Sequence, residues 1–115
     1  MAHHRTSGVD YFPLWAQAHV RGEQEPSPAL IAWMRSRAPE VRVLMLHFPP
    51  YCVVRLPGAF EVGAVAGYHP TGSLWLCRGL DMPREQWWWV HADDAEFVAA
   101  WRGLTQERVR EILMR

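Results

Sequence analysis

The sequence predicts an α+β domain in which four to five short antiparallel strands form a small β-barrel and helices pack on it. Short apolar runs separated by Gly and Pro turns occupy residues 51–99, which is typical of such strands. Helical spacing of apolar residues marks residues 29–48, and a capped amphipathic stretch covers residues 105–114. With 115 residues, half of them apolar and seven of them Trp, the chain fits a single domain, residues 1–115, with its own hydrophobic core.

Residues 1–48 are expected to form a helical N-terminal extension. The segment 11–20 fits one short helix. Ser27 and Pro28 then favour a second helix start, because Ser caps free N–H groups and Pro suits the first turn. The apolar residues that follow have helical spacing over two short helices divided at Pro39: Leu30, Ile31, Met34, Val41, Leu44, Met45 and Phe48. A strand over residues 41–48 is the alternative, since Val-Arg-Val is β-like.

Four strands are predicted over residues 51–56, 62–68, 73–78 and 86–91. The connection His69-Pro70-Thr71-Gly72 predicts a hairpin, because Pro favours the turn and Gly accepts the left-handed backbone after it.

The C-terminal part of the chain carries two further signals. Asp93-Asp94-Ala95-Glu96 fits either a helix capping box or a single 3₁₀ turn that leads into a fifth strand over residues 97–99. Thr105 is placed to cap the last helix, and Leu104 and Val109 are spaced as a hydrophobic staple.

The region from residue 50 to 99 follows a known pattern. Tyr51–Leu56 opens it, Gly63-Ala64-Val65 begins a hairpin whose turn contains Gly72, and a short turn precedes Phe97-Val98. This arrangement resembles bacterial SH3-like small barrels. Such barrels bind peptides, proteins or nucleic acids, or form parts of larger enzymes, so the resemblance implies a fold and not one function.

Neighbouring side chains on a strand point to opposite faces of a sheet. Alternation therefore places one set inside the predicted barrel: Cys52, Val54, Leu56, Leu74, Leu76, Trp88 and Val90. The other set points outward: Tyr51, Val53, Arg55, Trp75, Cys77, Trp87, Trp89 and His91. The outward set is too apolar to lie wholly in water, so we expect the flanking helices to cover it or a partner to bind it.

The outward face is the predicted binding surface, because Trp, Tyr and Arg are enriched at interface hot spots. The candidate partner-binding residues are Tyr51, Arg55, Tyr68, Trp75, Arg78, Trp87 and Trp89. The turn 69–72 and the loop 79–85 are expected to border it. The predicted function is a non-enzymatic binding or regulatory module whose partner is a protein.

The charge balance disfavours a nucleic-acid partner. The formal net charge is zero with neutral His, whereas phosphate binding depends on an excess of positive charge. All twelve basic residues are Arg, which a GC-rich genome explains without phosphate recognition. Nucleic acid stays an alternative, since bases can stack on aromatic residues that lie near Arg: Arg55, Tyr68, Trp75 and Arg78.

Enzyme chemistry has little support in the sequence. Cys52 and Cys77 lie in apolar runs and are interpreted as reduced core thiols. A metal site built from these two residues with His47 and His91 would need side chains on opposite faces to converge. We expect no metal and no cofactor, and a small enzyme or enzyme accessory chain with a His and Cys site is the third alternative.

The sequence also bears on location. No apolar run approaches the roughly 18 residues of a membrane-spanning helix, and the first eight residues lack the apolar core of an export signal. We therefore expect a cytoplasmic protein that has no membrane partner.

Overall fold

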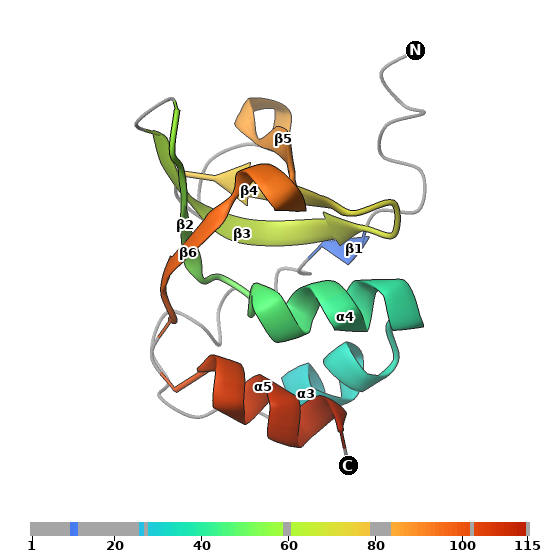
Figure 1. The fold of residues 1–115 in the computed structure, drawn as a ribbon. Coiled ribbons are helices and arrows are strands. Elements are labelled where there is room, and N and C mark those ends of the chain that lie inside the picture. The colour runs from blue at the N-terminus through green and yellow to red at the C-terminus, as the bar shows by residue number, and fades with distance from the viewer. Residues whose placement is uncertain are drawn as a thin grey trace.

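The structure is a computed structural model that describes residues 10–11, 26, 28–58, 61–78, 84–101 and 103–114. Within these residues an antiparallel sheet combines with three α-helices, which confirms the predicted α+β class. The helices lie together on one side of the sheet (Figure 1). No helix in the described part of the chain is long and apolar enough to cross a membrane.

The predicted helices of residues 29–48 are confirmed. They are α3 (Pro28–Arg35) and α4 (Pro39–His47), so the alternative strand over residues 41–48 is wrong. Each begins with a Pro, whose missing N–H has no partner to lose in the first helical turn. The helix predicted over residues 11–20 is wrong at Tyr11, which lies in the short strand β1 (Asp10–Tyr11). Its remaining residues, like Ser27, lie outside the described part of the chain.

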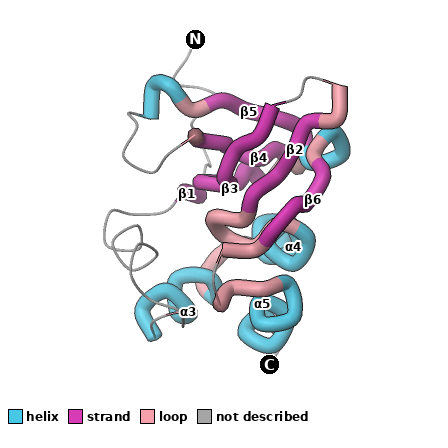
Figure 2. The backbone as a smooth tube through the Cα atoms, turned by 90° about the vertical axis from the view of Figure 1, so that its left-hand side faces the viewer, coloured by secondary structure: helices cyan, strands magenta, loops and turns pink. Residues whose placement is uncertain are grey.

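Five strands form a continuous antiparallel path in the order β5-β4-β3-β2-β6 (Figure 2). Their bounds are Val53–Leu56 for β2, Glu61–His69 for β3, Ser73–Cys77 for β4, Trp88–His91 for β5 and Glu96–Ala99 for β6. β1 pairs with β3 at Gly67 and Tyr68. Among the described residues no pairing joins β5 to β6, so the sheet is open and the predicted barrel is not confirmed.

The turns between the strands follow the sequence signals. Gly72 has φ +107°, and its N–H donates to the His69 carbonyl at 2.9 Å, which closes the predicted hairpin between β3 and β4. A 3₁₀ turn, η1 (Arg84–Gln86), precedes β5. A second one, η2 (Ala92–Asp94), leads directly into β6, so the 3₁₀ alternative for this acidic segment is confirmed.

A β-bulge in β3 shifts the alternation of side chains midway along the strand. The register changes between Val65 and Gly67, which leaves Ala66 as the extra residue. Val65 and Tyr68 are three positions apart and are nevertheless both buried in the main core. Without the bulge, strict alternation would turn Tyr68 to the opposite face.

The main core lies between the sheet and the helices. The helices, together with Leu104 just before the last of them, contribute Leu30, Met34, Val41, Met45, Leu104, Val109 and Ile112. The sheet and the turn before it contribute Tyr51, Cys52, Val54, Val65, Tyr68, Leu74 and Leu76, and half-buried Trp88 and Val90 pack against them. Of the seven residues predicted to share the inner face, only Leu56 lies outside this core.

For the helices that the structure describes, the expectation that they cover the outward face was wrong. They pack on the opposite face, where Val54, Leu74 and Leu76 are fully buried. This face carries the aliphatic side chains, and they complement the apolar stripes of the helices. The residues predicted to fill a barrel therefore fill the space between a sheet and a helical layer.

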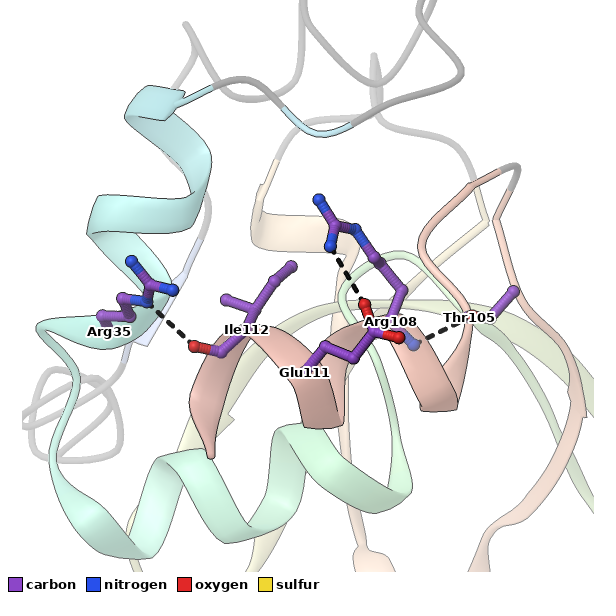
Figure 3. A network of polar contacts seen from close by, with 5 residues as sticks. All are labelled: Arg35, Thr105, Arg108, Glu111 and Ile112. Atoms are coloured by element: carbon purple, nitrogen blue, oxygen red, sulfur yellow. Dashed lines mark hydrogen bonds and ion pairs between the residues drawn. The ribbon is translucent and has the colours of Figure 1, made fainter. Parts of the chain in front are cut away.

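The last helix, α5 (Gln106–Leu113), ties the helical layer together (Figure 3). The Thr105 hydroxyl accepts the Arg108 N–H at 3.0 Å, as predicted for the N-cap. The Arg35 Nε–H donates to the Ile112 carbonyl at 2.8 Å and so joins the end of α3 to the end of α5. An ion pair between Arg108 and Glu111, 3.2 Å long, spans one helical turn.

Candidate functional site

A second apolar cluster, here called the indole cluster, lies on the sheet face opposite to the one against which α3, α4 and α5 pack. Its buried members are Ala66, Trp75, Cys77 and Trp87, and Ala64 and Trp89 pack against them. Alternation correctly separated Trp88, which faces the main core, from its neighbours Trp87 and Trp89.

The three indole rings of this cluster hold one another in fixed orientations. Trp75 and Trp89 are stacked, with ring centroids 5.2 Å apart and planes only 4° apart. Trp87 meets Trp75 edge to face at 4.9 Å and 72°. Trp75 and Trp87 are 6% and 7% exposed, whereas Trp89 is half-buried. Trp89 is therefore the member whose ring is both accessible and held in place by its neighbours.

The hairpin end borders Trp89, as expected for the turn 69–72. His69 pairs with Ser73 on β4, and Ser73 pairs with His91 on β5, so these three residues form one row across the sheet. The His69 ring lies edge-on to Trp89 at 6.0 Å and 84°. With Thr71 and Ser73, these two rings line a cavity of about 220 Å³.

Polar contacts hold the two imidazoles of this row in place. The Nδ1 atom of His69 accepts the Thr71 main-chain N–H, and that of His91 accepts the Asp93 N–H, both at 3.2 Å. The His69 Nδ1 also lies 2.7 Å from the Thr71 hydroxyl oxygen, and the His91 Nδ1 lies 3.5 Å from the Asp93 carboxylate.

A larger cavity, of about 650 Å³, is also lined by Trp89. One wall comes from the end of β2 and the turn after it, and the other from β5 and η2. The lining residues are Leu56, Pro57, Gly58, Trp89, Val90, His91, Asp93 and Asp94.

Two of the predicted site residues, Tyr51 and Tyr68, do not join the indole cluster. Both are buried in the main core, 1% and 0% exposed. The outward placement of Tyr51 was wrong because this residue precedes β2 in a left-handed conformation, φ 63°, and so does not follow the strand alternation. The Tyr68 hydroxyl donates to the Phe48 carbonyl at 2.6 Å, which anchors β3 to the end of α4.

The two predicted arginines also lie apart from Trp89. Arg55 points outward as expected, but its guanidinium is paired with the Glu96 carboxylate of β6 at 3.0 Å. Arg78 lies with its guanidinium 5.7 Å from the ring centre of Trp88, the indole of the opposite face. The structure thus brings together Trp75, Trp87 and Trp89, and separates them from the other four predicted residues.

The two cysteines occupy different environments. Cys52 is buried in the main core, and Cys77 is buried in the indole cluster. Burial raises the pKa of the Cys52 thiol from 9.0 to about 12. Since the thiolate is the nucleophile, Cys52 is unreactive at neutral pH.

Sequence reasoning found part of the smaller cavity and missed most of the larger one. The turn 69–72 was expected to border the outward face, and alternation placed His91 on the same face as Trp89. The pairing of Ser73 with His91 depends on the register between β4 and β5, which no local signal shows. Leu56 was assigned to the interior, and Asp93 and Asp94 were interpreted as residues that favour a helix or turn start.

Comparison with known proteins gives no relative from which a function could be transferred. The chain matches no protein-family model, no curated protein and no solved structure. The functional argument therefore rests on the geometry around Trp89.

Proposed function

We propose that this protein is a non-enzymatic binding module that holds a protein partner at the surface around Trp89. The observation that carries the proposal is the Trp75–Trp89 stack: a half-buried indole, whose ring centroid lies 5.2 Å from that of a buried one, lines two cavities. Rigid aromatic anchors beside pockets are characteristic of interface hot spots, because little side-chain entropy is lost when a partner packs against them.

The SH3-like resemblance is part of this proposal. The chain order β2, β3, β4, β5, η2, β6 supports it, since it follows the predicted succession of opening strand, hairpin, further strand, short turn and closing strand. In this chain the helical layer packs against that sheet and leaves the indole cluster on the other face.

The two rival functions have less support at this surface. Asp93 and Asp94 lie in the cavity beside Trp89, and their carboxylates would repel the phosphates of a nucleic acid. The raised pKa of Cys52 removes that thiol as a nucleophile at neutral pH.

The test is capture of a partner by the immobilised protein and by two Trp variants. Trp89→Ala should weaken retention of a specific protein by about tenfold or more, as truncation of an interface hot spot does. Trp33→Ala is the matched control, because Trp33 is a half-buried Trp on α3, packed against the main core rather than the indole cluster. Bound proteins are identified by mass spectrometry, and circular dichroism checks that each variant is folded.

Trp89→Ala also removes the ring that stacks on Trp75, so a second variant keeps that ring. Ser73→Arg fills the 220 Å³ cavity from β4 and should block binding without removing the indole. Equal retention of all partners by wild type, folded Trp89→Ala and Ser73→Arg would contradict the proposal.

A further inference from the structure

The cavity of about 650 Å³ beside Trp89 joins two segments more than thirty residues apart in the chain. Leu56, Pro57 and Gly58 form one wall at the β2 end, and residues 89–94 form the other. Its volume lies in the range of roughly 300–1,000 Å³ that is usual for ligand sites. It is open to the surface next to the proposed anchor, so a partner held at Trp89 can also enter it.

The lining of this cavity combines apolar surface with negative charge. Leu56, Pro57 and Val90 supply the apolar part, and the carboxylates of Asp93 and Asp94 lie on η2 at the same cavity. The Asp93 side chain is 90% exposed, so its charge faces solvent.

The neighbouring basic groups are fewer than these two carboxylates. No Arg is present among the described residues that line the cavity. The basic side chain among them is His91, whose Nδ1 lies 3.5 Å from the Asp93 carboxylate and accepts the Asp93 N–H at 3.2 Å. Arg55, next to Leu56, is paired with Glu96 at 3.0 Å.

We propose that this cavity takes a basic side chain, Arg or Lys, from an extended segment of the protein partner. The aliphatic stem of such a side chain packs on Leu56, Pro57 and Val90 while its cationic head lies at Asp93 and Asp94. Charge complementarity of this kind selects the partner and speeds its association. The inference rests on the proposed function and specifies the chemistry of the partner.

The test is an NMR titration of the ¹⁵N-labelled protein with two short synthetic peptides. One alternates leucine and arginine, and the other carries citrulline, the uncharged analogue, at each arginine position. The arginine peptide should give saturable shifts at the Trp89 indole N–H and at the amides of Gly58 and Asp94. It should bind several-fold more tightly than the citrulline peptide, and the difference should shrink as salt is raised.

Charge-neutralising variants identify the site. Asp93→Asn with Asp94→Asn should weaken binding of the arginine peptide by about three- to tenfold, the range expected for two exposed charges. Glu40→Gln with Glu107→Gln is the matched control, since it removes two exposed carboxylates from α4 and α5 and should leave binding unchanged. Equal binding of the two peptides, or equal effects of the two double variants, would overturn the inference.

The same variants separate this inference from the proposed function. If Trp89→Ala releases the captured partner while the Asp93 and Asp94 double variant retains it fully, the binding module stands and the basic side-chain site is wrong. If Trp89→Ala retains every partner, the proposed function itself fails.

Discussion

The two faces of the sheet are built from the same strands but carry different kinds of side chain. The face toward the helices collects aliphatic side chains such as Val54, Leu74 and Leu76, all fully buried. The other face collects three Trp residues with small neighbours, and one of these, Trp89, is only half-buried. Aliphatic side chains fill the space between the sheet and the helices, whereas the indole rings stack on one another. We therefore expect the first face to supply most of the stability, and the binding that we propose lies on the second.

The largest expected effect lies in the main core. Leu76→Ala should lower the free energy of unfolding by about 2–5 kcal/mol, because it leaves a cavity among fully buried neighbours. Chemical denaturation followed by circular dichroism measures the change. A loss below about 1 kcal/mol would show that the helix-covered face is not the main source of stability.

Alkaline pH should lower the free energy of unfolding through a residue of the same core, Cys52. The folded-state pKa of Cys52, about 12, lies above its ordinary value of 9.0, so the thiol ionises first in the unfolded chain. Its contribution to the free energy of unfolding is therefore complete below pH 9 and is lost as pH rises toward 12. The loss amounts to about 1.4 kcal/mol per pH unit in this window. Cys52→Ala should flatten the decline between pH 9 and 10, before the ordinary pKa of 10.0 for Tyr68 is passed. An unchanged slope in denaturation curves of that variant would contradict the assignment.

The smallest effect is expected at the outward ion pair. Arg55 and Glu96 are half-exposed, at 52% and 50%, so their contact at 3.0 Å is screened by water. Arg55→Ala should reduce the free energy of unfolding by less than about 1 kcal/mol, and less still at high salt. A double-mutant cycle with Glu96→Ala measures the coupling, and a value above 2 kcal/mol would mean that the outward face contributes more stability than the comparison allows.

Much of the fold could be predicted, because its signals are local. Pro28 and Pro39 mark helix starts, Thr105 marks an N-cap and Gly72 marks the hairpin, and each acts through backbone geometry within a few residues. The burial of Tyr51 and Tyr68 in the main core could not be predicted. Tyr51 has a left-handed backbone, and a bulge in β3 precedes Tyr68; both interrupt the alternation of side chains, and neither has a sequence signal of its own.

The sequence by itself determined that Trp88 and its two neighbours lie on opposite faces, since alternation is a property of any strand. Only the tertiary structure decided which face the helices cover and which residues surround Trp89. Coverage depends on how whole layers fit together, and the row of His69, Ser73 and His91 depends on register between strands. Helix coverage and strand register both involve residues far apart in the sequence, so the packing energies of many residues together determine them.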